Sequence, residues 1–161
     1  MTVRMVTRGA IIAAMYVVLT ISPGLNAISF HQVQFRISEM LMVLACFELA
    51  AVPGLWIGCM IANGFGPLGI LDVTLGAGLT LVAAALMYRI GPRWNSMAVP
   101  VVVNAFGVAV VLSLTLELPY WPSVLWVGLG EAGVMLLLGV PLFALLKNNP
   151  AILGIEERRG I

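Results

Sequence analysis

The chain has 161 residues, of which 61% are hydrophobic and 9% are charged, and its formal net charge at pH 7 is +1. A soluble domain of this size carries about 25% charged residues, so the composition excludes a soluble globular fold. A nearly neutral chain also gives no indication of a nucleic-acid partner. We expect an all-α integral membrane protein surrounded by membrane lipid, because helices satisfy their own backbone hydrogen bonds in lipid.

Six apolar runs follow one another along the chain, at residues 9–22, 38–51, 53–66, 69–88, 96–117 and 122–147. The first run resembles a signal peptide, but Leu25 stands where a good cleavage site needs a small residue. We therefore expect a retained first helix. The second and third runs are shorter than the span of about 20 residues that a bilayer requires. Residues 40–63 could instead form one helix with Glu48 in its middle, which would give five spans.

The basic residues favour six spans over five. With the N-terminus in the cytoplasm, six spans place seven of the eight basic residues inside and only Arg36 outside, whereas five spans place six of them outside. The positive-inside bias favours the first arrangement. Pro53 and Gly54 support a break there, because proline ends a helix. The sequence thus predicts a single domain over residues 1–161, a compact bundle of six transmembrane helices in the cell membrane with both termini cytoplasmic.

The longest polar connection, at residues 23–37, runs into the stretch HQVQFRISEM at residues 31–40. Its segment VQFRI alternates apolar and polar residues, which predicts an extended outer lid rather than a helix. Arg36 lies in this stretch, on the side where an orientation rule does not place a basic residue. We therefore expect Arg36 to have another role.

Polar groups inside the apolar runs are the candidates for function, because an ionisable residue at mid-membrane costs about 2.5–3.5 kcal/mol. Several of them lie in the outer half of the predicted bundle and could converge on one pocket. The candidate substrate-binding residues are Gln34, Arg36, Glu39, Asn63, Asp72, Asn104, Trp126 and Glu131.

Structural interpretations compete with these roles. Arg36 and Glu39 could form only a local ion pair at a helix start, and Asp72 could be a first-turn carboxylate. Asparagine side chains could bond between helices, and Trp126 could be an interfacial anchor. Glu131 has the weakest structural alternative, because nothing near it in the sequence neutralises its charge.

Several patterns indicate packing rather than chemistry. GFGPLG at 64–69 and GLGEAG at 128–133 match GxGxxG, but neither follows a strand as a dinucleotide site requires. We interpret these glycines, GLWIG at 54–58, and the pair Ala10 and Ala14 as small residues that let helices approach closely. No P-loop, HExxH, GxSxG or clustered His/Cys set is present. We expect no catalytic residues, no metal and no cofactor, and therefore not an enzyme.

The segments QFRISEMLMVL and AVPGLWIGCMIANGFGPLGILDVTLGAGLTLVAA, within residues 34–84, resemble the substrate-binding S components of energy-coupling factor transporters, in the branch assigned to queuosine precursors. The resemblance implies that the protein binds a 7-deazaguanine such as preQ0, preQ1 or queuine from outside. It also implies docking on a shared energising module of one membrane subunit and two ATPase subunits, with Ala10 and Ala14 facing the membrane subunit.

The candidate residues suit such a ligand. A deazaguanine edge presents an N–H and an amino group side by side, which one carboxylate accepts together. The ring carbonyl needs a donor, the flat ring an aromatic face, and a cationic aminomethyl group a second carboxylate. Three alternatives remain open: an S component for another small vitamin-like nutrient, a small proton-coupled carrier or channel that uses Glu131 and Asp72, or a membrane scaffold without a ligand.

Overall fold

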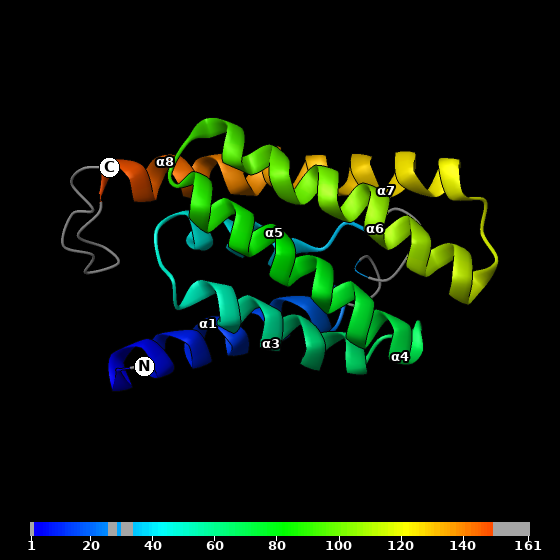
Figure 1. The fold of residues 1–161 in the computed structure, drawn as a ribbon, viewed down its shortest axis with the longest axis horizontal. Coiled ribbons are helices and arrows are strands. Elements are labelled where there is room, and N and C mark those ends of the chain that lie inside the picture. Colours follow the sequence, from blue (N-terminus) through cyan, green and yellow to red (C-terminus); the bar gives the residue numbers. More distant parts are fainter. Residues whose placement is uncertain (1, 26–28, 30–33, 150–161) are drawn as a thin grey trace.

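A computed structural model describes residues 2–25, 29 and 34–149, and its regular structure within these ranges is helical, with no strand. Four helical stretches are long and apolar enough to cross a membrane, and two apolar helices are shorter. The long stretches are α1 (Val3–Ile21); α4 (Gly69–Leu71) with η2 (Asp72–Gly76) and α5 (Ala77–Ile90); η3 (Trp94–Met97) with α6 (Ala98–Leu116); and α7 (Tyr120–Val134) with η4 (Met135–Gly139) and α8 (Val140–Asn148). The shorter helices are η1 (Ile37–Cys46) and α3 (Ala51–Gly64) (Figure 1).

Within the described residues, the prediction of an all-helical chain with six helices is confirmed, and four of the six are long enough to cross a membrane. Residues 47–50 interrupt the helices between η1 and α3, so the alternative of one helix over 40–63 is wrong. η1 is a 3₁₀-helix rather than the α-helix expected there. Seven residues of the predicted outer connection at 23–37, including His31, and the basic residues at 158–159 lie outside the described residues.

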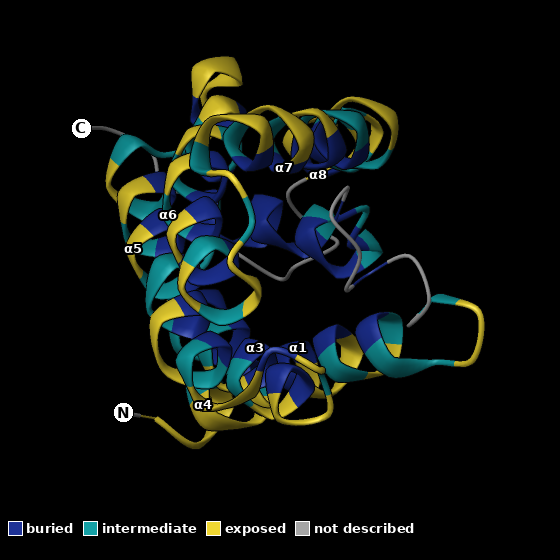
Figure 2. Ribbon diagram, turned by 90° about the vertical axis from the view of Figure 1, so that its right-hand side faces the viewer, coloured by how far each residue is buried: buried dark blue, intermediate teal, exposed yellow. Residues whose placement is uncertain are grey.

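The short helix η1 lies at the centre of the bundle. η1 packs against α1, α3, α5, α7, η4 and α8, and eight of its ten residues are buried. Buried residues face inward in the surrounding helices, while the outer faces are exposed (Figure 2). These outer faces carry large apolar side chains such as Val102, Phe106, Leu129 and Leu136, as expected for a surface in contact with lipid.

Small residues bring α1 and α3 into close contact, and the two helices lie side by side in Figure 1. A Cβ atom added at Gly54 would stand 2.6 Å from the carbonyl oxygen of Gly9, and one at Gly58 would stand 2.9 Å from that of Ala13. The small-residue interpretation of GLWIG is therefore confirmed. In GFGPLG it is wrong for Gly64 and Gly69, where an added Cβ atom would meet nothing within 4 Å.

We expect Gly54→Ala to destabilise the protein by about 1–3 kcal/mol, because the new methyl group would push against the backbone of α1. Gly64→Ala, in the same helix but with free space around it, is the matched control. It should be neutral or stabilise by about 0.4–1 kcal/mol, through the unfolded state. Thermal unfolding of both variants in detergent measures the difference. Equal stability of the two would show that α1 and α3 can separate at no cost.

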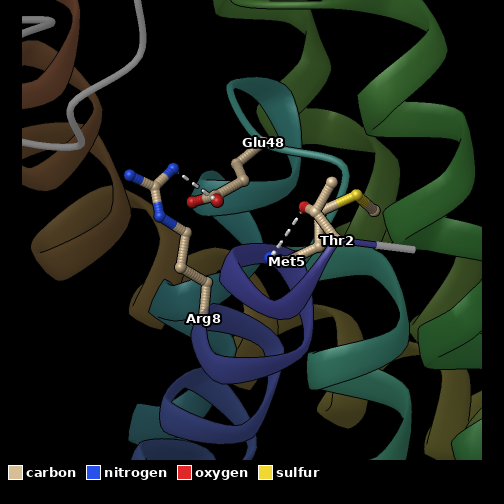
Figure 3. Close-up of polar contacts among 4 residues, drawn as sticks. All are labelled: Thr2, Met5, Arg8 and Glu48. Atoms are coloured by element: carbon tan, nitrogen blue, oxygen red, sulfur yellow. Dashed lines mark hydrogen bonds and ion pairs between the residues drawn. The ribbon is translucent and has the colours of Figure 1, made fainter.

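An ion pair ties the beginning of α1 to the break before α3 (Figure 3). Arg8 Nη1 lies 2.8 Å from Glu48 Oε1, and Thr2 caps α1 by accepting a hydrogen bond from the backbone N–H of Met5 at 3.4 Å. The Glu48 carboxylate therefore lies at a turn and has a basic partner. This agrees with the expected position of Glu48 outside the middle of a helix.

Candidate functional site

The buried charged residues of the described part of the chain form one cluster. Arg36, Glu39, Asp72 and Glu131 are each no more than 6% exposed. Arg36 immediately precedes η1, Glu39 lies in its first turn, and the two other carboxylates come from η2 and α7. The guanidinium interacts electrostatically with Glu39 and Asp72, and the pair Glu39 and Glu131 interact with each other. Arg36 and Glu131, which are 95 positions apart in the sequence, thus meet in the interior.

The backbone before η1 is extended, as the alternating pattern predicts. Arg36 has φ −93° and ψ 99°, and the polar residues Gln34, Arg36 and Ser38 point inward and are buried. α7 makes room for this segment with a glycine, since a Cβ atom at Gly130 would stand 2.8 Å from the carbonyl oxygen of Gln34. The glycines of GLGEAG therefore allow a close approach, here between a helix and an extended segment.

η1 places its polar groups on the inner face because a 3₁₀-helix repeats every three residues. Arg36 and Glu39 are three residues apart, so their side chains leave the backbone in the same direction. The backbone N–H of Glu39 donates a hydrogen bond to the Arg36 carbonyl at 3.0 Å. Ten residues is long for this type of helix, and such stretches often mark functional positions.

A π-helical turn holds the Asp72 carboxylate inside the bundle. Asp72 begins η2, and Asn63 Nδ2 of α3 donates a hydrogen bond to its carbonyl oxygen at 2.9 Å. A Cβ atom at Gly76 would overlap the Asp72 carboxylate, so the glycine leaves the space that this carboxylate occupies. π-Helical turns occur frequently at functional sites.

Two buried hydroxyl groups of α1 belong to the cluster, and neither was among the candidate residues predicted from the sequence. The Tyr16 hydroxyl donates a hydrogen bond to Glu39 Oε1, and Thr20 Oγ1 lies 2.7 Å from Ser38 Oγ. Their spacing of four residues places both on one face of the second half of α1, whose other residues from Gly9 to Ile21 are apolar. That pattern was the available signal.

The remaining candidates divide between the interior and the surface. Asn104 of α6 is 5% exposed and lies beside the carboxyl groups of Glu39 and Glu131. Trp126 is 43% exposed and is not part of the cluster, so its position suits the alternative role of an interfacial anchor. Tyr16 is an aromatic side chain that does contact the cluster, through its hydrogen bond to Glu39.

The cluster has more acceptors than the described residues satisfy. The buried atoms Glu39 Oε2, Asn63 Oδ1, Asp72 Oδ2 and Glu131 Oε1 accept no hydrogen bond from the described residues, and Gln34 Nε2 donates none to them. Each unsatisfied buried polar group costs about 1–3 kcal/mol. The side chains form no group within the described ranges that could hold a metal ion. The arrangement is therefore complementary to a compact molecule that carries several hydrogen-bond donors.

A separate apolar groove of about 620 Å³ runs between α1 and α3. Ala10 and Ala14 line it on one side, and Pro53, Ile57 and Ile61 on the other. Ala10 and Ala14 are exposed, whereas Tyr16 lies on a different, buried face of α1. None of the charged residues of the cluster lines this groove, so the molecule presents two distinct features: an enclosed polar cluster and an open apolar groove.

Comparison with known proteins agrees with these features. The family model described as QueT transporter matches residues 6–148, which include the whole polar cluster and the part of α1 that carries Ala10 and Ala14. A curated protein named Queuosine precursor transporter QueT, from Lactococcus lactis subsp. cremoris (strain MG1363), is 36% identical over 136 residues, 76% of this chain and 80% of that protein. No solved structure matches the chain. The family is one of transporters, which supports the prediction that the chain is not an enzyme, and the extent of both matches shows that the chain belongs to the QueT transporter family.

Proposed function

We propose that the buried polar cluster binds a queuosine precursor, as the name of the Lactococcus relative suggests for that protein. We further propose that the chain acts as the substrate-binding component of an energy-coupling factor transporter in the cell membrane. The observation that carries the first proposal is the set of buried acceptor atoms on Glu39, Asn63, Asp72 and Glu131, which accept no hydrogen bond from the described residues.

A 7-deazaguanine base supplies the donors that these acceptors need. Its ring N–H and exocyclic amino group lie side by side and suit one carboxylate, in a charge-assisted pair. Its ring carbonyl is an acceptor, which Gln34 Nε2 or the Arg36 guanidinium can serve. Both side chains are buried at the end of the extended segment.

The charge of the cluster favours a cationic precursor. Three of the buried ionisable groups that interact with Arg36 are the carboxyl groups of Glu39, Asp72 and Glu131, so the cluster carries a net formal charge of −2 when these three groups and Arg36 are all ionised. Uncompensated charge in a low-dielectric interior is strongly unfavourable. A precursor with a protonated aminomethyl group offsets one negative charge, whereas the neutral nitrile form offsets none.

Mass spectrometry of the small molecule released from the purified protein tests this function. We expect a 7-deazaguanine with an aminomethyl substituent. In isothermal titration, the aminomethyl form should bind at least about tenfold more tightly than the nitrile form, a difference of about 1.4 kcal/mol. Glu48→Gln, which changes a carboxylate outside the cluster, is the control. Release of an unrelated nutrient would contradict the proposed function. Equal affinity for the aminomethyl and nitrile forms would contradict the charge argument.

We propose that both termini are cytoplasmic, because the basic residues then lie almost entirely inside. A cysteine introduced at Pro92, between α5 and η3, should not react with a membrane-impermeant maleimide in intact cells. A cysteine introduced at Glu117, between α6 and α7, should react. Both positions are exposed, and Cys46 and Cys59 are buried. The reverse labelling pattern would require the opposite orientation.

The apolar groove between α1 and α3 is the proposed contact for the energising membrane subunit. Exposed small residues such as Ala10 and Ala14 allow a partner helix to approach the backbone closely. The lining is apolar on both helices, as an interface inside a membrane requires. The groove is separate from the cluster, so a partner and a substrate can bind at the same time.

A further inference from the structure

The hydroxyl group of Tyr16 is the point at which α1 reaches the carboxylates of the polar cluster. The Tyr16 side chain is fully buried, and its hydroxyl donates a hydrogen bond to Oε1 of Glu39. The second oxygen of this carboxylate, Oε2, is also buried and accepts no hydrogen bond from the described residues. The two oxygens of Glu39 therefore differ, since Oε1 accepts a hydrogen bond from Tyr16, whereas Oε2 accepts none from the described residues although the Asn104 side chain lies beside the carboxylate.

We propose that Tyr16 is a positioning residue of the binding site, whose hydroxyl holds Oε1 of Glu39 so that Oε2 faces a donor group of the ligand. The inference rests on the proposed function, because it requires Glu39 to contact the bound base. A carboxylate that is already oriented loses less freedom when the ligand binds than one that rotates. Preorganisation of this kind increases affinity without adding a contact.

The surroundings of Tyr16 keep the hydroxyl in place. A Cβ atom at Gly58 would stand 2.9 Å from the Cβ atom of Tyr16, so the tyrosine packs directly against the backbone of α3. One turn further along α1, Thr20 Oγ1 lies 2.8 Å from the Tyr16 carbonyl oxygen and 2.7 Å from Ser38 Oγ. The contact between Thr20 and Ser38 joins α1 to the residue beside Glu39, so the Tyr16 hydroxyl and the Glu39 carboxylate are both held in place.

The same contacts would exist if Tyr16 only filled the core. A filling role would make its hydroxyl matter for stability alone, whereas a positioning role makes it matter for ligand affinity through Glu39. Tyr16→Phe separates these roles, because it keeps the ring and removes the hydroxyl. Tyr120→Phe is the matched control, since the Tyr120 hydroxyl donates a hydrogen bond to the Phe106 carbonyl at 3.3 Å at an exposed position.

Isothermal titration of the full chain in detergent with 7-aminomethyl-7-deazaguanine provides the first measurement. We expect Tyr16→Phe to weaken binding by about tenfold, the usual effect of losing a hydrogen bond to a charged group. Tyr120→Phe should change the affinity by less than about twofold. Circular dichroism and thermal unfolding without ligand establish that both variants fold.

A double-mutant cycle with Glu39 then distinguishes positioning from packing. In a Glu39→Ala background, adding Tyr16→Phe should change the affinity by less than about threefold, because no carboxylate remains to be positioned. If binding by Glu39→Ala is too weak to measure, Glu39→Asp takes its place. Glu39→Asp keeps a carboxylate but shortens the side chain that meets the Tyr16 hydroxyl. Adding Tyr16→Phe to it should therefore also change the affinity by less than about threefold.

Each result decides for or against the inference. Unchanged affinity in Tyr16→Phe overturns it, and so does an equal loss in the presence and absence of the Glu39 substitution. If the unmodified chain does not bind the deazaguanine, the proposed function fails and the inference fails with it. If the unmodified chain binds the deazaguanine and Tyr16→Phe binds it with the same affinity, the inference fails but the proposed function stands.

Discussion

Replacing Glu131 by glutamine is expected to lower the affinity for 7-aminomethyl-7-deazaguanine by about a hundredfold, or about 2.7 kcal/mol. Glu131 is 3% exposed, and its Oε1 atom accepts no hydrogen bond from the described residues. Glutamine keeps the shape but replaces one acceptor with a donor. That donor would face a donor of the ligand, a buried mismatch that costs about 1–3 kcal/mol. The variant also removes one of the charges that attract a cation.

Although Glu131→Gln should bind the ligand more weakly, it should not be less stable than the unmodified chain when no ligand is present. A buried carboxylate without sufficient compensation opposes folding, so Glu131→Gln should unfold at the same temperature as the unmodified chain or at a higher one. The increase in unfolding temperature that the ligand produces should disappear, because ligand stabilisation follows from affinity. Loss of binding with unchanged or raised stability thus separates a ligand contact from a structural one.

Isothermal titration and thermal unfolding in detergent measure both effects. Glu117→Gln is the control, because Glu117 is an exposed carboxylate at the end of α6, and we expect no change in affinity. Equal affinities for Glu131→Gln and the unmodified chain would assign Glu131 to a structural role. The binding site would then have to be centred on Glu39 and Asp72.

The positions of the helices could be predicted well because lipid imposes a simple rule on the sequence. Apolar runs must be helical, and the distribution of basic residues separated six helices from five. The 3₁₀ form of η1 could not be predicted, because periodicity over a short and largely apolar segment does not separate an α-helix from a tighter one. Tertiary packing decides the form, since η1 is buried among α1, α3, α5, α7 and α8.

The members of the polar cluster were largely predictable, but their contacts were not. Glu39, Asp72 and Glu131 are identifiable because charge inside an apolar run is costly. Tyr16 was missed because its side chain is uncharged, so its place inside an apolar run carries none of the cost that singles out a carboxylate there. Trp126, five residues before Glu131, was a candidate for the same site, yet it is 43% exposed, because five positions along an α-helix do not return to the same face.

Filling the apolar groove is expected to prevent assembly with the energising module while leaving substrate binding intact. In the variant Ala10→Trp/Ala14→Trp, two large side chains would occupy the space between α1 and α3 that a partner helix needs. Both positions are exposed, so the substitutions should not disturb the bundle. The polar cluster lies on a different face of α1, so the affinity for 7-aminomethyl-7-deazaguanine should change by less than about twofold.

Co-purification of the tagged chain with a membrane subunit and two ATPase subunits, co-expressed with it, measures assembly. We expect at least about a tenfold loss of the co-purified subunits for the double variant. Ile11→Trp/Met15→Trp is the matched control, because both residues are exposed on α1 but neither lines the groove. Normal assembly is expected for this control. If both pairs of substitutions abolish co-purification, the whole exposed surface of α1 forms the interface, and if neither does, the partner docks elsewhere and the groove is filled by lipid.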